Sequence, residues 1–428
     1  MKGKPLLVYL SLKNVGPAPL MEMPLAPRLN LITGDNGLGK SFLLDIAWWV
    51  LTRTWARQMI LPDPPPTVPK ISYAHSARSM THENTSHFDR ATERWIFQRS
   101  RPPIPELVIY AQVDGGFSVW DPARNYWKKG DPERPSAYLF TPTEVWEGNE
   151  LCEGLIRDWA SWQREGSEAY AQLERVLHAL SPSPSEPLTA GELRKVTLDD
   201  PKRYPTLKMP YGQEVPVIHA SAGMRRIIAL AYLLVWSWQE HIAACQLRGE
   251  PPTEEIIFLI DEVEAHLHPQ WQRRIVPAIL DVMNAMTGKH SANVQLIAAT
   301  HSPLVLASAE PLFDPLKDAW FDLDLVNDER KVAKVALEKR PFVRRGGFSP
   351  TFSAIARSPG SLTFAANLPG SGAGTIRIIQ EPRYCFEMRT SVPRTCLYRS
   401  ANFAAVYRLF RSLLWRASLC LSAQAPVL

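Results

Sequence analysis

Cysteine is scarce in this chain of 428 residues: five occur, and no two of them form a C-x-x-C pair. Their scattered positions argue against a disulfide framework and are typical of a reducing cytoplasm. Long apolar runs are also missing, because the longest, Ile227 to Trp236, is about half of a membrane span. The apolar run near the N-terminus is too short for a signal peptide. We therefore expect a cytoplasmic protein with no membrane partner.

Lysine is absent from residues 341–428, which contain 11 arginines and only two acidic residues, Glu381 and Glu387. The first 340 residues hold 37 basic and 41 acidic side chains, so the net charge of +5 comes from the tail. The acidic body argues against a broad basic surface for nucleic acid and leaves room only for a local DNA-binding patch.

What the chain does contain is enough apolar sequence for a large core, with 45% hydrophobic and 21% charged residues. Its length allows two or three domains. Continuous apolar strands at 256–260 and 294–299 alternate with helical segments at about 222–245 and 269–286. This alternation predicts an α/β fold with a parallel sheet covered on both faces.

The other segments are read from turn residues and periodicity. Residues 53–105 are rich in proline and are expected to be a loop or an insertion. Residues 107–111 and 117–120 are expected to form a hairpin around the Asp-Gly-Gly turn between them. Apolar residues at helical spacing predict helix between residues 151 and 180.

The most specific motif is the stretch 34–41, which fits the phosphate-binding pattern G-x-x-x-x-G-K-[ST]. A strand-like run precedes it and a helix-like run follows, as this motif requires. Glycines let backbone N–H groups wrap around an anion, Lys40 would reach the β- and γ-phosphates, and Ser41 would ligate Mg²⁺. We predict an ATP and Mg²⁺ site formed by Gly34, Asp35, Asn36, Gly37, Leu38, Gly39, Lys40, Ser41 and Phe42.

Two further groups end the buried strands. Asp261 and Glu262 follow the strand at 256–260, where Asp261 would support Mg²⁺ and Glu262 would orient or deprotonate the attacking water. His301 follows the next strand and could sense the γ-phosphate. Alone, these residues would be read as a solvated turn and a hydrogen-bonded loop histidine. The P-loop favours the functional interpretation.

Ser221, Ala222 and Gly223 stand at the start of the long helix. Ser221 is a good N-cap, and this structural role is certain to be part of its function. The further interpretation is that Ser221 and the Gly223 N–H bind a γ-phosphate held by a second subunit.

Four motifs occur in a fixed order: Asn36-Gly-x-Gly-Lys-Ser, Ser221-Ala-Gly-Met-Arg-Arg, Leu259-Ile-Asp-Glu-Val-Glu-Ala-His-Leu-His-Pro and Ala299-Thr-His-Ser-Pro. Together they resemble the AAA-type ATPases with ABC-like heads, a group that includes OLD-family ATPases, retron-type anti-phage ATPase subunits and RecF-like proteins. The resemblance covers about residues 1–345. The extension from Glu264 to Pro269 favours this group over transporter subunits, and Val263 stands where the family often has proline.

The resemblance implies a P-loop NTPase with an ABC-type head, in which helices flank a mixed sheet. A helical subdomain would be inserted between the P-loop at 34–41 (the Walker A motif) and the motif that begins at Ser221 (the signature). The implied domains are an N-terminal part of the head at 1–150, a helical lobe at 151–218 and the rest of the head at 219–345. An atypical basic tail would occupy 346–428.

The resemblance also implies roles for single residues. Lys40, Glu262 and His301 would be catalytic, Ser41 and Asp261 would hold the metal, and Ser221 and Gly223 would act across a head-to-tail ATP dimer. Gln112 is a candidate for the glutamine that couples the γ-phosphate to the helical lobe. His266 and His268 are read as structural, because their spacing alone is poor evidence for a metal site.

The function expected from these features is an ATPase whose ATP-dependent homodimer regulates a partner, such as a nuclease, in phage defence or DNA repair. One alternative is a nucleotide-regulated DNA-binding or scaffold protein with little turnover. Another is the ATPase subunit of an ABC transporter.

The tail has two interpretations. The change in composition suggests a shift of reading frame near 346–348, which would leave a non-native or disordered end. The alternative is a native basic tail that binds nucleic acid or a partner. Its two acids are too few for the clustered carboxylates of a metal-dependent nuclease.

Overall fold

The computed structural model describes residues 5–35, 37–77, 80–97, 106–125, 137–253, 255–286, 293–323, 335–336, 353–358, 361–368, 372–380 and 386–390. The chain divides into two compact units, Met1–Phe342 and Val343–Leu428. Asn36, the cysteines at 385, 396 and 420 and the proposed frame boundary at 346–348 lie outside the described residues. The frame shift therefore stays a hypothesis.

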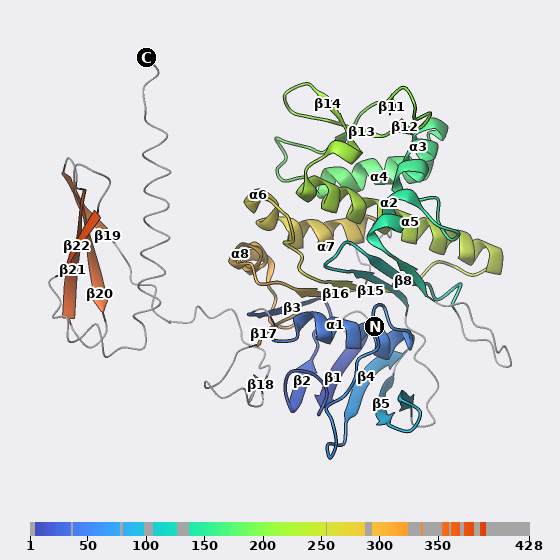
Figure 1. The fold of residues 1–428 in the computed structure, drawn as a ribbon, viewed down its shortest axis with the longest axis horizontal. Coiled ribbons are helices and arrows are strands. Elements are labelled where there is room, and N and C mark those ends of the chain that lie inside the picture. Colours follow the sequence, from blue (N-terminus) through green and yellow to red (C-terminus); the bar gives the residue numbers. More distant parts are fainter. Residues whose placement is uncertain are drawn as a thin grey trace. The chain divides into compact units, whose positions relative to one another are not determined.

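A seven-stranded sheet forms the centre of the first unit, in the order β17-β3-β16-β15-β7-β8-β9 (Figure 1). The strands are β3 (Leu29–Gly34), β7 (Leu107–Ala111), β8 (Phe117–Trp120), β9 (Tyr138–Phe140), β15 (Glu255–Ile260), β16 (Asn293–Ala299) and β17 (Asp318–Leu323). The five strands from β17 to β7 are parallel, whereas β8 and β9 are antiparallel additions. The predicted hairpin and the predicted mixed sheet are confirmed.

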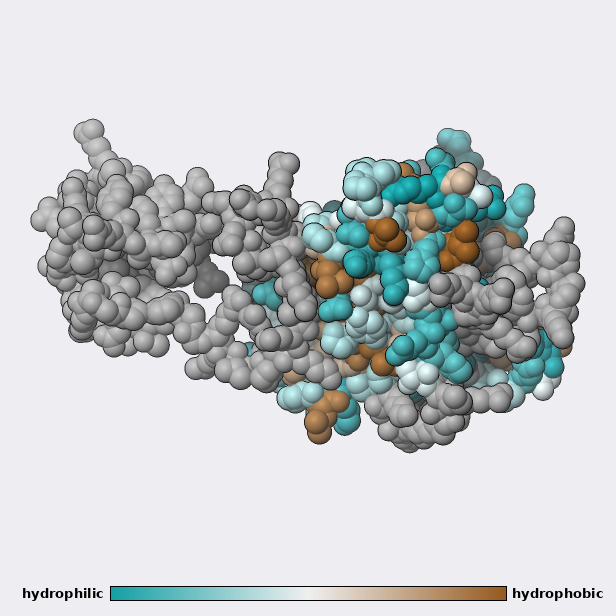
Figure 2. All heavy atoms as spheres, turned by 90° about the horizontal axis from the view of Figure 1, so that it is seen from below, coloured by the Kyte–Doolittle hydropathy of each residue, from teal (hydrophilic) through white to brown (hydrophobic). Residues whose placement is uncertain are grey.

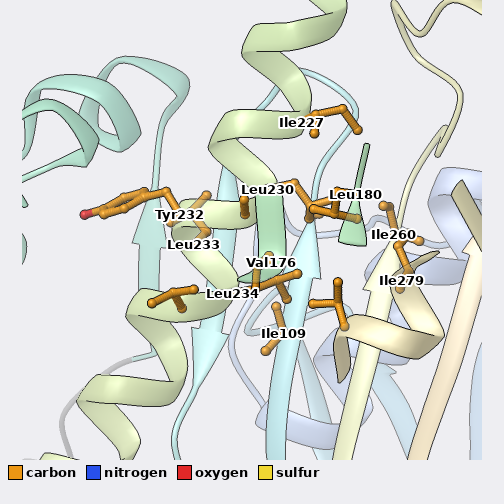
Figure 3. Packing of buried hydrophobic residues seen from close by; sticks show 14 of the residues in the cluster. Ile109, Val176, Leu180, Ile227, Leu230, Tyr232, Leu233, Leu234, Ile260 and Ile279 are labelled. Carbon is orange, nitrogen blue, oxygen red and sulfur yellow. The ribbon is translucent and has the colours of Figure 1, made fainter. Parts of the chain in front are cut away.

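Helices cover one face of this sheet. They are α3 (Leu155–Glu165), α4 (Glu168–Ala179), α5 (Ala222–Arg248) and α7 (Ile275–Met286). Figure 3 shows Ile227, Leu230 and Leu233 of α5 packed among side chains of β7, β15, α4 and α7. Because α5 lies in the middle of this layer, it connects the helical lobe to the sheet.

The other face is covered by α1 (Lys40–Thr52) and by a second sheet rather than by helices alone. Neighbouring residues of one strand divide between the two faces: Ile109 packs with the helical layer, and Val108 and Tyr110 pack with α1. This period of two is what a strand buried on both faces requires.

The second sheet corrects one prediction, because residues 53–105 are not simply irregular. Its order is β18-β2-β1-β4-β5-β6. The strands are β1 (Leu7–Lys13), β2 (Leu20–Pro24), β4 (Lys70–Ala77), β5 (Met80–Asp89), β6 (Arg94–Phe97) and β18 (Val335–Ala336). The prolines at 62–69 end where β4 begins, so they mark only the preceding loop. In β4, buried Ile71 and Tyr73 alternate with Ser and Lys, which made the apolar pattern weak.

The part of the chain after β9 is helical at first and then consists of short strands. The helical pattern expected between 151 and 180 is confirmed and consists of two helices, since Gly166 ends α3 in the left-handed conformation and Ser167 caps α4. The smaller elements of this part are α2 (Pro142–Glu147), β10 (Thr189–Ala190), β11 (Arg194–Lys195), β12 (Arg203–Tyr204), β13 (Thr206–Lys208), β14 (Glu214–Pro216) and the 3₁₀ helix η1 (Val217–His219).

The segments after the central strands are short. The helix expected at 269–286 is divided into α6 (Pro269–Gln272) and α7. They are followed by α8 (Pro303–Ala309) and the 3₁₀ helix η2 (Glu310–Leu312). In the second unit, β19 (Ser353–Ser358), β20 (Ser361–Leu368), β21 (Gly372–Gln380) and β22 (Phe386–Thr390) form an antiparallel sheet.

α5 alone among the described helices is long and apolar enough to cross a membrane by length and composition. However, 72% of its most apolar window is buried inside the protein. It is therefore packed as a core helix. The face of the molecule in Figure 2 is mostly hydrophilic over its described residues, with small separate hydrophobic patches.

Asp158 links the lobe to α5 and is expected to make stability depend on pH. Its Oδ2 accepts a 2.6 Å hydrogen bond from the Tyr232 hydroxyl, and burial raises its pKa from 3.8 to about 6. The folded state therefore holds this proton more tightly, and stability falls as pH rises from about 4 to about 6. The loss is up to about 3 kcal/mol. Asp158→Asn should remove this slope from unfolding curves measured between pH 4 and 8. An unchanged slope would contradict the assignment.

Candidate active site

The site lies at one edge of the central sheet, where the carboxyl ends of β3, β15 and β16 meet. These strands are neighbours in a parallel arrangement, so the loops that follow them emerge on the same side. The P-loop follows β3, Asp261 and Glu262 follow β15, and Thr300 and His301 follow β16. The fold thus brings three of the predicted motifs together.

The loop at 34–39 closes on the side chain of Lys40, the first residue of α1. Lys40 is buried, and its Nζ donates to the carbonyl oxygens of Gly34 at 2.8 Å and Asp35 at 3.0 Å. Gly39 precedes α1 with a φ of 96°, and a Cβ there would lie 2.6 Å from Pro17 Cγ. Glycine is therefore required at this position by both conformation and space. The N-terminus of α1 directly follows this loop, a position in which backbone N–H groups generally favour an anion.

The side chains of Leu38 and Phe42 anchor this segment rather than face the loop interior. Both are partly buried against the core formed by α1 and the second sheet. The ring of Phe42 occupies the space beside Gly16, where a Cβ would lie 2.5 Å from Phe42 Cε1. Their predicted contact with a nucleotide would therefore come from their backbone groups.

Ser41 and Asp261 bring a hydroxyl and a carboxylate together. Ser41 Oγ donates to Asp261 Oδ1 at 3.0 Å, across the gap between α1 and β15. Asp261 is fully buried, and burial raises its pKa, while the Ser41 hydrogen bond and the charge of Arg57 lower it. A hydroxyl and one carboxylate fit Mg²⁺, which usually keeps several waters and substrate phosphates as its other ligands.

A second feature of this edge is a charged cluster around Arg57 that the sequence did not reveal. Arg57 Nη2 lies 3.0 Å from Asp45 Oδ1 and 3.4 Å from Asp261 Oδ2, and donates to the Tyr110 hydroxyl at 2.9 Å. Burial alone would lower the pKa of Arg57, but the neighbouring Tyr110, Asp45 and Asp261 raise it above its usual value. The cluster compensates part of the negative charge beside Asp261.

Glu262 and His301 lie close to each other on the two loops. Glu262 Oε1 is 4.0 Å from His301 Nδ1, and both side chains are partly exposed, 31% and 41% respectively. Glu262 has a φ of 45°, an uncommon backbone conformation for this residue type that is often associated with functional sites. A third carboxylate, Glu264, is nearer to the same nitrogen, at 3.2 Å. Sequence reasoning gave Glu264 no role.

Among the described residues, no side-chain hydrogen bond joins Ser221 or Gly223 to the P-loop, to Asp261 and Glu262, or to His301. Ser221 is exposed and caps α5, with its hydroxyl accepting from Met224 N at 3.3 Å. Gly223 is buried, and a Cβ there would lie 2.6 Å from the His266 carbonyl oxygen. The start of α5 therefore touches the segment after β15 with its backbone, whereas Ser221 is exposed.

Arg226, one turn into α5, connects this helix to Asp261. Its Nη1 donates to Val113 O at 3.0 Å and its Nη2 donates to Asp261 O at 3.2 Å. Burial lowers its pKa, and the charges of Asp114 and Asp261 oppose this effect. Gln112 is buried nearby, with Nε2 donating to Ser118 Oγ at 2.9 Å, and lines the same small cavity as Arg226.

The residues missed from the sequence share one property, which is that their partners are distant along the chain. Arg57 lies in an irregular segment and Glu264 lies within a recognised motif that suggested no contact for it. Arg226 had one sequence cue: it is the second of two adjacent arginines, Arg225 and Arg226, which follow the motif Ser221-Ala222-Gly223. In the described parts of the chain, no group of three or more His, Cys, Asp or Glu residues is arranged to hold a metal. The structural interpretation of His266 and His268 stays a prediction.

The sheet order, the P-loop before α1 and the acidic pair after β15 define the class: an α/β P-loop NTPase with an ABC-type head. The family model described as "AAA domain, putative AbiEii toxin, Type IV TA system" matches residues 29–307. The match covers more than half of the chain, and the protein belongs to this family. The predicted kinship with ABC-like AAA ATPases is confirmed.

Curated relatives match over shorter segments. The Retron Vc95 probable ATPase of Vibrio cholerae serotype O1 biovar El Tor is 34% identical over 98 residues, which is 23% of this chain and 17% of that protein. The Retron Ec83 probable ATPase of Escherichia coli is 45% identical over 49 residues, which is 11% of this chain and 8% of that protein. The chain thus spans less than a fifth of the length of either relative.

Solved structures with a similar fold were also found. The SMC head domain from Thermotoga maritima aligns with a TM-score of 0.38 at 14% identity, covering 76% of this chain and 96% of that one. The recombination mediator protein RecF, in a structure titled RecF-ATPrS, aligns with a TM-score of 0.38 at 12% identity, covering 75% and 97%.

Proposed function

We propose that this protein binds ATP with Mg²⁺ at the P-loop edge and hydrolyses it. The observation that carries the proposal is the 3.0 Å hydrogen bond between Ser41 and Asp261, beside the loop that wraps Lys40. It supports the proposal because a hydroxyl and a carboxylate from different elements meet beside the loop, where they would hold the metal. In this role Mg²⁺ would neutralise the charge of the β- and γ-phosphates.

The chain's own residues would divide the remaining work. Backbone groups of the P-loop would hold the phosphates, and the Lys40 ammonium would exchange its two carbonyl partners for phosphate oxygens. Glu262 would orient the attacking water and accept its proton. His301, on the adjacent loop, would contact the γ-phosphate and respond to its loss.

We further infer that the complete site needs a second copy of this chain. Ser221 is exposed at the N-terminus of α5, where backbone N–H groups and the helix dipole favour an anion. In a head-to-tail dimer each Ser221 would meet the γ-phosphate bound by the other subunit. Hydrolysis would then release the dimer and change the state of a partner.

The biological setting is proposed from the relatives. Because two of them are retron ATPases, we place this protein in phage defence, with DNA repair as the alternative, in the cytoplasm. The partner would be a nuclease or another effector. A nucleotide-regulated DNA-binding scaffold is the competing function, and ATP turnover measured with and without DNA separates the two, since a scaffold would show negligible rates in both.

Ser221→Asp tests the dimer. Aspartate is as good an N-cap as serine, so the melting temperature should stay the same. The added negative charge would face the γ-phosphate, so the ATP-dependent dimer should weaken at least tenfold in light scattering, while nucleotide binding to the monomer persists.

Ser167→Asp is the matched control, because Ser167 caps α4 in the same way, with its side chain accepting from Tyr170 N. This variant should dimerise like the unmodified protein. An ATP-dependent dimer of normal strength in Ser221→Asp would exclude Ser221 from the interface.

A further inference from the structure

Glu264 is a buried carboxylate whose hydrogen-bond partners, among the residues that the structure describes, belong to the loop after β16. Its side chain is 6% exposed. Oε2 accepts from Thr300 Oγ1 at 2.6 Å, Oε1 accepts from His301 N at 2.7 Å, and Oε1 lies 3.2 Å from His301 Nδ1. Burying a carboxylate is costly unless donors satisfy it. Here Thr300 and His301 supply both hydrogen-bond donors and the nearby ring nitrogen, so the carboxylate is committed to that loop.

We propose that Glu264 is the positioning residue for His301, a role that rests on the proposed ATP hydrolysis. By holding the backbone N–H and Nδ1 of the same residue, the carboxylate fixes the position of the loop and the rotation of the imidazole ring together. A partner on one ring nitrogen determines the direction of the other. Nε2 therefore points away from Glu264 and can meet a γ-phosphate oxygen.

The two carboxylates near His301 Nδ1 differ in how far they are buried. Glu262 is 4.0 Å from this nitrogen and 31% exposed, which leaves it free to bind water. Glu264 is 3.2 Å away and almost fully buried, so it is closed to water. One carboxylate is thus left for the reaction, while the other orients the histidine.

A separate network holds the backbone of this loop, which makes the proposal testable without unfolding it. Ser302 Oγ donates to Gln272 Oε1 at 2.7 Å, and Gln272 Nε2 donates to Leu267 O at 2.8 Å. Ser302 also caps α8. The loop is therefore fixed on its far side by residues other than Glu264, so Glu264→Gln should change the ring of His301 rather than the fold.

The test is a double-mutant cycle of Glu264→Gln and His301→Ala, with kcat, KM and ATP affinity measured for each variant. Glu264→Gln should lower kcat at least tenfold and change KM less than threefold. In the His301→Ala background the same substitution should change kcat less than twofold, because its effect passes through the ring. Glu144→Gln is the control, since Glu144 bonds a backbone N–H and a threonine hydroxyl in the capping box of α2.

Two results would overturn the proposal. One is a normal kcat for Glu264→Gln, and the other is an equal fall in kcat with and without His301, which would indicate a general structural role. If the unmodified protein hydrolyses no ATP, the proposed function fails, and NMR of ¹⁵N-labelled histidine decides the positioning role alone. An unchanged His301 ring signal in Glu264→Gln would then refute the positioning role of Glu264.

Discussion

Replacing Glu262 with glutamine is expected to lower kcat for ATP at least about 100-fold and to leave ATP affinity unchanged, since general base catalysis typically contributes 10²–10⁴-fold. Glutamine has nearly the same shape, so it can hold a water in place but cannot take its proton. The partly exposed carboxylate lies beside His301, at the edge where β15 and β16 end. ATP should persist in the site, so an ATP-bound dimer should accumulate on size exclusion.

Glu250→Gln is the matched control for this prediction. Glu250 is half-exposed and paired with Arg248, at the other end of α5 from the site. Its substitution should leave both turnover and dimer content as they were. Unchanged turnover in Glu262→Gln would remove this residue from the mechanism, and lost ATP affinity would point to a binding role instead.

Replacing Lys40 with alanine is expected to weaken ATP binding at least about 100-fold, which corresponds to about 3 kcal/mol. The ammonium is buried inside the loop and already faces two carbonyl oxygens, so it is held where the β- and γ-phosphates would enter. Removing it takes away a charge-assisted bond to each phosphate. Titration calorimetry with a slowly hydrolysed ATP analogue measures this loss directly.

Lys317→Ala serves as the control for Lys40. Lys317 is 61% exposed and pairs with Asp314 on the surface, so its loss should change neither ATP affinity nor the melting temperature. A Lys40→Ala protein that folds normally and binds ATP like the unmodified chain would refute the P-loop assignment. A large fall in its melting temperature would show that the lysine also stabilises the empty loop.

The elements predicted best were those whose physical signal is local. The runs at 256–260 and 294–299 are continuous and apolar because both faces of these strands are buried, and they form β15 and β16. The P-loop was visible because its glycines, lysine and serine are required at fixed spacing by backbone geometry. The edge position of Asp261 and His301 then followed from the general rule for parallel sheets.

The elements predicted worst were those whose signal depends on partners elsewhere. β4 pairs with β1, more than fifty residues earlier, and its alternation was obscured by serine and histidine. Proline clusters before it dominated the interpretation of the whole segment, although they affect only the loop. A local reading could not show that this region supplies half of a sheet.

The same limit applies to the site. The contact between Arg57 and Asp261 depends on the path that the chain takes after α1. No sequence motif specifies that path. Glu264 was visible within a recognised sequence, yet its two hydrogen-bond donors come from residues 36 and 37 positions later. The spacing of the motifs identified which residues lie at this edge of the sheet. Only the contacts in the folded protein distinguish Glu262, which is partly exposed to water, from Glu264, which contacts the ring of His301.

α5 is held at both ends, so it acts as a strut between two distant parts of the first unit. Its 27 residues make a rod of about 40 Å. The first turn touches the catalytic edge through Gly223 and Arg226, and the far end is pinned by the 2.8 Å contact between His241 and Asp121. Between these two contacts the side chains from Ile227 to Trp238 are packed in the core, so the helix is braced along its length as well as at its ends. The α3–α4 lobe is bonded to the same helix through the Tyr232 hydroxyl, so the lobe and the edge share one rigid element.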